Sequence, residues 1–268
     1  MKRALATVAV TVIGGLMVGC DAPQEEESLE APEVEEVDET AVDQDVSAPW
    51  DEAEGEADEL AARVVKAHGV EAFDELSALS FDFVVIAEGE EAFRASHVWD
   101  LEANEDRIVW AVDEAEVEVL LDVDGQEALE AMRDGEALEG EQRQEMEEAA
   151  YQRWVNDTYW LLVPLKLFDD GVYRDHLGTH EVDGQSFEVL ELSFEQVGLT
   201  PGDRYELRVE PDSGEIASWV MDLEGSDETT EVMWGGYEDV GPLRLSLERD
   251  WPEADRQIRL ENVTVDRD

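Results

Sequence analysis

Residues 60–268 of the sequence predict an α+β domain that is mainly antiparallel β, with one large curved sheet of about ten strands. Three observations lead to this prediction. Short segments with alternating apolar residues recur along the chain, turn residues separate them at regular intervals, and one helical segment interrupts them near the middle. Because helices need a surface to pack on, we expect the N-terminal and central helices on the concave side of the sheet.

The domain is predicted to begin with an amphipathic helix. Asp58 is placed to cap its start, and Gly69 suits its C-terminal end. The apolar stripe between them consists of Leu60, Val64, Val65 and His68. A short second helix would carry Phe73 and Leu76.

Four segments then have the pattern of an antiparallel meander. They are Leu79–Ile86, Phe93–Leu101, Arg107–Val112 and Val117–Val123. In the first of them, Phe81, Phe83 and Val85 share one face because side chains alternate along a strand. Asp124 and Gly125 mark the turn that ends the meander.

Residues 126–162 depart from the alternating pattern, and we predict helical structure there. Apolar and small residues recur near helical spacing, namely Leu138, Met146, Ala149, Ala150 and Trp154. Tyr159–Leu167 is the most apolar stretch of the chain after the N-terminal region, and Pro164 interrupts it.

The second half returns to strand patterns. The expected strands are Phe187–Phe194, Arg204–Val209, Ile216–Leu223, Thr229–Trp234, Leu243–Glu248 and Gln257–Val265. The turn signals between them are Asp183-Gly184, Pro201-Gly202, Asp212-Ser213-Gly214, Gly225-Ser226 and Gly235-Gly236.

The N-terminus has the features of a lipoprotein export signal over residues 1–20. Lys2 and Arg3 precede an apolar run from Ala4 to Val18, which has the length of a signal-peptide core rather than of a membrane-spanning helix. The run ends in Leu16-Met17-Val18-Gly19-Cys20, which resembles the lipobox of bacterial lipoproteins, with Met17 where Leu is usual. We therefore predict lipidation of Cys20, a membrane anchor and a location in the cell envelope, on the periplasmic or outer side of a bacterial membrane.

Because Cys20 is the only cysteine, its lipidation leaves no thiol for disulfides, metal ligation or nucleophilic catalysis in the domain. The next residue, Asp21, resembles the inner-membrane retention signal of enteric bacteria. That rule varies between lineages, so the choice between inner and outer membrane stays open.

Residues 21–59 are predicted to be a disordered acidic tether. The segment has 18 acidic residues, no Lys or Arg, and three prolines. A flexible coil of this length spans about 35 Å on average, enough to hold a domain away from a lipid surface. An acidic arm that recruits a basic partner or cations is the alternative.

The remaining 209 residues are acidic by themselves, with 54 Asp and Glu against 16 Lys and Arg. Lysine is scarce, with only Lys2, Lys66 and Lys166 in the whole chain. Acidic residues spread through every segment are typical of a halophilic protein, in which salt screens the self-repulsion. The same charge repels nucleic-acid phosphates and anionic lipid headgroups, so we expect no nucleic-acid partner and no binding to lipid headgroups.

The order of helix, meander, central helices and second meander on an exported chain is similar to the half-open barrel of the lipoprotein carriers of the Lol system. Several segments also resemble a family of exported bacterial proteins that share a domain of unknown function. They are Val65–Gly69, Leu79–Phe83, Leu162–Leu167 with Asp169–Gly171, Leu177-Gly178, Asp183-Gly184, Trp234–Tyr237 and Gly241–Leu243. The resemblance implies a half-barrel fold and an envelope location, and some members carry an aldolase label.

Few residues suggest catalysis or metal binding. A Schiff-base aldolase needs a desolvated lysine, and Lys66 and Lys166 are better explained as exposed or ion-paired. His176 and His180 have a spacing that binds metal on a helix, but Gly178 lies between them and the segment leads into a strand. Asp122–Gly125 begins like a calcium loop but lacks its later ligands, and we interpret it as a turn. We expect no enzymatic activity, no metal and no cofactor.

The aromatic residues indicate a ligand cavity on the concave face. Large apolar side chains facing inward on a curved sheet would line it. The candidate residues are Phe81, Phe83, Trp99, Trp110, Trp160, Leu162, Trp219 and Trp234. The competing interpretation is an ordinary core filled by the same side chains.

Two hypotheses about function stay open. In the first, a membrane-anchored, monomeric, non-enzymatic lipoprotein binds an apolar or lipid ligand, or a lipidated partner, in the half-barrel. In the second, the domain has a filled core and acts as a structural or protein-interaction module. The two differ in whether an apolar cavity opens beneath the helices.

Overall fold

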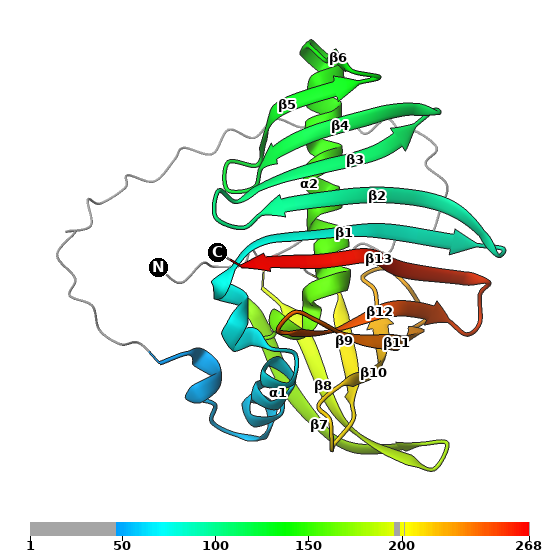
Figure 1. Ribbon diagram of the computed structural model, residues 1–268. Helices are drawn as coiled ribbons and strands as arrows, with labels where there is room; N and C mark the ends of the chain where they lie inside the picture. Colours follow the sequence, from blue (N-terminus) through cyan, green and yellow to red (C-terminus); the bar gives the residue numbers. More distant parts are fainter. Residues whose placement is uncertain (1–46, 196–198, 201, 268) are drawn as a thin grey trace, which may run out of the picture.

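The computed structural model describes residues 47–195, 199–200 and 202–267. The predicted signal peptide, Cys20 and the tether up to residue 46 lie outside the described residues, as do part of the turn expected at Pro201-Gly202 and the C-terminal residue. The described part is one large antiparallel sheet with two α-helices and three short 3-10 helices (Figure 1).

Strands β1 to β6 form the N-terminal half of the sheet. Their bounds are β1 (Leu76–Ala87), β2 (Glu90–Asp100), β3 (Glu105–Val112), β4 (Ala115–Asp122), β5 (Glu127–Arg133) and β6 (Glu136–Ala137). Each strand pairs with the next one in the chain.

Strands β7 to β13 form the C-terminal half. Their bounds are β7 (Val172–Val182), β8 (Gln185–Phe194), β9 (Arg204–Val209), β10 (Ile216–Asp222), β11 (Thr230–Val240), β12 (Leu243–Trp251) and β13 (Arg256–Arg267). The last strand, β13, pairs with β1, so the sheet order runs β6-β5-β4-β3-β2-β1-β13-β12-β11-β10-β9-β8-β7. The edge strands β6 and β7 do not pair, and the curved sheet therefore stays open, as the predicted fold class requires.

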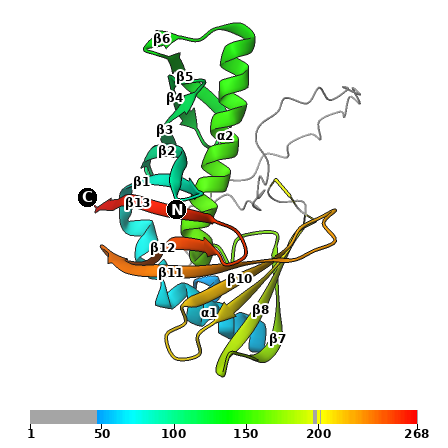
Figure 2. The same cartoon turned by 90° about the vertical axis from the view of Figure 1, so that its right-hand side faces the viewer.

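Helix α1 (Glu56–Ala67) covers β7 and β8, and α2 (Gly140–Leu162) runs across the strands of the N-terminal half toward the C-terminal half. Figure 2 shows both helices on the inner side of the curved sheet. The 3-10 helices are η1 (Pro49–Asp51), η2 (Val70–Glu75) and η3 (Val163–Leu165). The prediction of N-terminal and central helices on the concave side is confirmed.

Ordered structure begins earlier than the sequence suggested. Helix α1 starts at Glu56 with Gly55 as its N-cap, so Asp58 is not the cap; it lies in the first turn and forms an ion pair with Arg174 (2.9 Å). Trp50 in η1 packs against Phe168. The last residues assigned to the tether therefore belong to the folded part.

Gly69 fixes the end of α1 against the β11–β12 hairpin. Its φ is +84°, and a Cβ atom there would lie 2.4 Å from the carbonyl oxygen of Pro242. Only glycine meets both conditions, the left-handed conformation and the close approach of two backbones. Gly69 thus ends the helix, as predicted.

All ten predicted strands are present, and three more extend the sheet. The helical prediction was wrong for residues 127–137, which form β5 and β6. A register shift places Leu120 opposite Glu130 and Leu121 opposite Ala128, so β5 carries an extra, exposed residue, Leu129. This bulge spaces the buried Ala128 and Ala131 three residues apart, which imitates a helical period.

The predicted turn at Gly235-Gly236 was also wrong, because β11 continues through both glycines to Val240. Gly235 pairs with Glu248 and Tyr237 with Ser246, while Gly236 has a φ of +61° and kinks the strand. The chain turns later, at Gly241 and Pro242. Glycines inside a strand thus mark an irregularity here rather than its end.

Candidate functional site: the concave face beneath α2

The eight residues predicted to contact a ligand all belong to one buried core cluster. Phe81, Phe83, Trp99 and Trp110 come from β1 to β3, Trp160 and Leu162 from α2, and Trp219 and Trp234 from β10 and β11. Each of the eight is at most 6% exposed. In this arrangement the chain's own side chains occupy the concave face, so contact with a ligand requires α2 to move. That contact stays a prediction.

The aromatic residues form two groups, one in each half of the sheet. In the C-terminal half the Trp219 ring lies 4.8 Å from Trp160 and 5.9 Å from Trp234, measured between ring centroids, and Tyr205 is 4.6 Å away. In the N-terminal half Trp99 meets Trp154 of α2 edge to face at 5.5 Å. Helix α2 thus contributes an aromatic residue to each group.

Three buried indole N–H groups in these two groups have no hydrogen-bond partner among the described residues. They belong to Trp154, Trp219 and Trp234. A buried tryptophan usually finds an acceptor for its N–H, and leaving a donor unpaired costs about 1 to 3 kcal/mol. The face beneath α2 therefore presents donors that the protein itself does not satisfy.

A buried cluster of charges attaches α2 to the N-terminal half of the sheet. The His97 ring of β2 contacts the Asp106 carboxylate of β3 through Nδ1 (2.7 Å) and the Asp157 carboxylate of α2 through Nε2 (3.1 Å). All three residues are at most 1% exposed, and Phe81 stacks flat on the imidazole ring. Two consecutive strands and a helix residue 60 positions after His97 thus meet at one side chain.

The two carboxylates keep His97 charged. Burial alone would lower its pKa, but Asp106 and Asp157 raise the pKa of His97 to about 9. As both ring nitrogens donate to carboxylates, no lone pair is available to accept a proton from a substrate. The cluster resembles two members of a hydrolytic triad, but its geometry makes it a clamp between helix and sheet rather than a general base.

Arg153 adds a second cation beside this clamp. Its guanidinium lies over the rings of Phe93 (4.2 Å) and Trp110 (5.2 Å). Burial lowers the pKa of Arg153, and the charge of Asp157 opposes that shift. The two cations and the two carboxylates leave the local charge close to zero.

Arg249 on β12 is the corresponding cation of the C-terminal half, and it is fully buried. Its Nη1 donates to the Ser246 carbonyl, the Ser246 hydroxyl and the Glu248 carbonyl, and its Nη2 donates to the Trp160 carbonyl of α2 (2.6 Å). The guanidinium also lies 3.4 Å from the centroid of the Trp234 ring. No carboxylate forms an ion pair with it among the described residues, and burial lowers the pKa of Arg249 to about 9.

Pro164 explains why the Trp160 carbonyl is open to Arg249. In a helix that carbonyl would accept from the N–H four residues later, and that residue is Pro164, which has no N–H. Arg249 therefore takes the place of a helical donor near the C-terminal end of α2.

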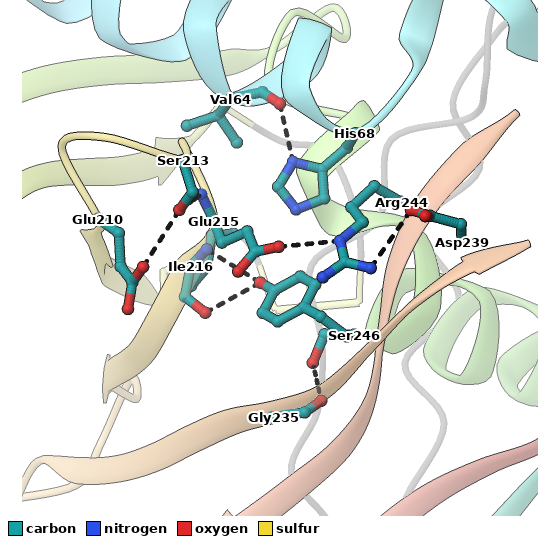
Figure 3. Close-up of polar contacts among 11 residues, drawn as sticks. Val64, His68, Glu210, Ser213, Glu215, Ile216, Gly235, Asp239, Arg244 and Ser246 are labelled. Atoms are coloured by element: carbon teal, nitrogen blue, oxygen red, sulfur yellow. Dashed lines mark hydrogen bonds and ion pairs between the residues drawn. The ribbon is translucent and has the colours of Figure 1, made fainter.

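A second polar cluster lies at the end of α1 (Figure 3). The Arg244 guanidinium bridges the carboxylates of Glu215 (2.9 Å) and Asp239 (3.2 Å). These residues, with Lys66 and Ser213, line a pocket of about 500 Å³. The cations and carboxylates of this pocket are paired with one another or, for Lys66, with Asp51. The residues that line this pocket thus connect α1 with the β9–β10 turn and the β11–β12 hairpin.

His68 lies beside this pocket and is the second buried histidine of the fold. Its Nδ1 is 2.8 Å from the Val64 carbonyl oxygen, which only accepts, so Nδ1 carries the proton (Figure 3). Burial lowers the pKa of His68, so the ring is neutral near pH 7. His68 and His97 therefore have opposite charge states for a physical reason: two carboxylates contact the His97 ring, whereas the hydrogen bond of the His68 ring goes to a backbone carbonyl.

The remaining sequence candidates have structural roles. Lys66 pairs with Asp51 (2.7 Å) and Lys166 with Asp169 (3.1 Å), as expected for ion-paired lysines. In the predicted turn at Asp122–Gly125, the Asp122 carboxylate accepts from the Gly125 N–H (3.0 Å). This confirms the turn.

His176 and His180 lie on the extended strand β7. At a rise of about 3.3 Å per residue, a strand separates positions i and i+4 much further than a helix does. Among the described residues no group of three or more His, Cys, Asp or Glu side chains is arranged to hold a metal ion.

The sequence analysis missed His97, Asp106, Asp157 and Arg249. A signal was present for three of them. His97 alternates with Ala95 and Trp99, Asp106 with Ile108 and Trp110, and Arg249 with Leu245 and Trp251, all on inward-facing positions. A polar residue in an apolar row of a strand therefore indicates a buried polar cluster. Asp157 gives no such signal because that end of α2 is buried on every side.

No protein-family model and no curated protein sequence matches the chain. Among solved structures, it is similar to a DUF1329 family protein from Desulfovibrio piger, with 13% identity over 78% of this chain and 91% of that chain and a TM-score of 0.42. It is also similar to a LolA superfamily protein from Nitrosomonas europaea, with 9% identity over 78% and 94% of the two chains and a TM-score of 0.47. The lipoprotein LppX of Mycobacterium tuberculosis shows 10% identity over 77% and 95% of the chains, with a TM-score of 0.29.

These structures thus include a LolA superfamily protein and a protein with a domain of unknown function. All three TM-scores lie below 0.5. Within the described residues, neither helix has the length and apolar composition needed to cross a membrane.

Proposed function

We propose that the protein is a non-enzymatic, membrane-anchored envelope lipoprotein that binds an apolar or lipid ligand, or the acyl chain of a lipidated partner, between α2 and the concave face. Lipidated Cys20 would be the anchor, and the acidic segment after it the spacer. Its host would be a bacterium of saline habitats, because the acidic surface needs screening.

The observation that carries this proposal is the set of unpaired indole donors on α2 and on the face beneath it. In a core whose only role is to stabilise the fold, three buried N–H groups without acceptors are unfavourable, because each one lowers stability. The ester or carboxylate oxygens of a lipid would satisfy them, while its chain would lie against the tryptophan rings.

Helix α2 can act as the cover of this site because its contacts are uneven. Residues 154–162 are buried almost continuously, whereas most of the first turns from Gly140 to Glu148 are exposed. The exposed part contacts β5 through polar groups, Arg143 to the Ala128 carbonyl and Glu147 to the Ala128 N–H. Polar contacts at the surface exchange readily with water, so this end of the helix can open first.

The test is a tryptophan-fluorescence titration of the purified chain with a 16-carbon fatty acid in molar salt. The wild type should bind with saturation. Asp157→Asn, which weakens the clamp, should raise the open fraction and with it the apparent affinity by about tenfold. Near-ultraviolet circular dichroism checks that the variant is folded.

Glu145→Gln is the matched control, because Glu145 is exposed on the same helix and loses the same charge. It should bind like the wild type. Absence of saturable binding in folded wild type and folded Asp157→Asn would contradict the proposal. It would favour the second candidate, a structural or interaction module, which the nearly complete burial of the concave face supports.

A further inference from the structure

Arg249 carries a buried positive charge that the fold leaves without a counter-ion. The chain has 72 acidic residues, yet the four acceptors of this guanidinium are three carbonyls and one hydroxyl. A buried charge is costly unless an opposite charge and hydrogen bonds compensate it. An uncompensated cation in so acidic a protein therefore needs an explanation.

One of its acceptors belongs to the cover of the proposed site. The Trp160 carbonyl lies in the last turn of α2, where the unpaired carbonyls carry partial negative charge. This helix end stands in for an anion in the closed arrangement. When α2 moves away, Arg249 loses that acceptor and gains the capacity to bind another one.

Several unpaired donors lie at Arg249 or on the rings next to it. Its own Nε has no partner, the Trp234 ring on which it stacks has an unpaired N–H, and so does the adjacent Trp219. A cation surrounded by N–H donors selects a ligand group that is negative and has several acceptor oxygens.

We propose that Arg249 is the head-group subsite for an amphiphile with an anionic head, a carboxylate or a phosphate on a long alkyl chain. This inference rests on the proposed function and names its ligand class. The head would take the place of the Trp160 carbonyl on the guanidinium, accept from the free N–H groups, and leave the chain along the tryptophan face.

The charge on the surface of the protein disfavours an anionic ligand, whereas the buried Arg249 favours it. A net charge of −54 repels anions at long range, but salt screens that repulsion over about 3 Å at 1 M. Arg249 is fully buried, so its attraction is screened much less. The experiment therefore belongs in molar salt.

Four ligands with the same 16-carbon chain separate the contributions of head and chain. They are hexadecanoate, hexadecyl phosphate, methyl hexadecanoate and hexadecylamine, each titrated below its micelle concentration with tryptophan fluorescence as readout. We expect at least one of the two anions to bind about tenfold or more tightly than the methyl ester, and the amine to bind most weakly.

Variants of the full chain then test whether Arg249 causes the preference for an anionic head. Arg249→Met should reduce the preference for the anion over the ester to less than about twofold while the ester still binds. Arg249→Lys keeps the charge but not the planar fork, and should retain part of the preference. Arg259→Met on the neighbouring strand is the matched control, because Arg259 is exposed and loses the same charge. It should behave like the wild type.

The outcomes distinguish the two proposals. Equal binding of anions and ester by the wild type would overturn the head-group subsite and leave the apolar site in place, and so would a preference that survives in Arg249→Met. Binding of none of the four ligands would refute the proposed function and this inference with it. Because the wild-type comparison needs no variant, it remains decisive even if Arg249→Met fails to fold.

Discussion

Two buried cations attach α2 to the two halves of the sheet, and they differ in what surrounds them. In the N-terminal half, His97 lies between the carboxylates of Asp106 and Asp157. In the C-terminal half, Arg249 is surrounded by neutral oxygens, an aromatic ring and unpaired donors. The first cation has its counter-ions and is complete as a structural clamp. The second is complete only as long as the end of α2, or a ligand, supplies negative charge.

This difference assigns separate roles to the two halves. The His97 clamp sets how firmly α2 is held, because it joins the helix to two strands through charge-assisted hydrogen bonds. The surroundings of Arg249 determine which ligand group can replace the Trp160 carbonyl at the C-terminal end of α2. Holding and selecting are thus carried out at two contacts near the C-terminal end of the same helix, at Asp157 and at Trp160.

The largest expected effect is the loss of the clamp. Asp157→Asn leaves the His97 charge with one carboxylate fewer in a fully buried place, which should lower the free energy of unfolding by about 3 to 5 kcal/mol. Urea unfolding followed by tryptophan fluorescence measures it, with Glu145→Gln as control. A loss below about 1 kcal/mol would mean that the clamp does not hold α2 to the sheet.

The strands were predictable because one side of the sheet is buried and the alternation of side chains is visible in the sequence. Strand β7 was missed because it is an edge strand on which only Val172 is fully buried, so apolar and polar residues do not alternate. The aromatic residues of the candidate site were predicted for the same reason as the strands. Their division into two groups was not, since it depends on β13 pairing with β1 across the whole chain.

The pairing of charges could not be predicted from the sequence at all. His97 and Asp106 face inward on neighbouring strands, but their contact depends on the register of β2 and β3, and Asp157 is 60 residues away from His97. One feature near these charges can be predicted from the sequence, namely that the Trp160 carbonyl has no helical donor. Pro164 stands four residues later, so a helix through Trp160 must leave that oxygen without a helical donor.

The next largest effect is the pH dependence of the clamp. The folded-state pKa of His97, about 9, lies above the ordinary histidine value near 6.5, so the folded protein holds this proton more tightly than the unfolded chain. The resulting stabilisation, on the order of 3 kcal/mol, is fully present below pH 6.5 and is lost as the pH rises through 9. His97→Gln should remove this alkaline decline.

His68 provides the contrast within the same titration. Burial lowers its pKa in the folded state, so its contribution is present above pH 6.5 and is lost as the pH falls below that value. Urea midpoints of wild type, His97→Gln and His68→Gln between pH 5 and 9.5 separate the two histidines. An unchanged alkaline decline in His97→Gln would show that another group causes it.

A smaller effect is expected for the stability of Arg249→Met. The substitution leaves carbonyls without a donor, which costs about 1 to 3 kcal/mol, but it also removes an uncompensated buried charge. The net loss should therefore be smaller than that of Asp157→Asn under the same conditions. If Arg249→Met were the more damaging of the two, the guanidinium would be the main structural link of α2, and the division between holding and selecting would have to be reversed.

The smallest expected effect is that of salt on the losses of stability caused by Asp157→Asn and by Arg249→Met. The wild type should become more stable from dilute buffer to molar salt, because screening relieves the repulsion of its acidic surface. His97, Asp157 and Arg249 are buried, so the penalties of Asp157→Asn and Arg249→Met should each change by less than about 1 kcal/mol. Thermal unfolding of the three proteins at both salt concentrations measures this. Equal stability of the wild type in both buffers would contradict the halophilic interpretation. If instead the loss of stability caused by one of the two substitutions disappears in salt, water must reach the cation concerned. In the latter case that contact of α2 would already be open without ligand, and the difference between the two halves of the sheet would be one of access rather than of charge.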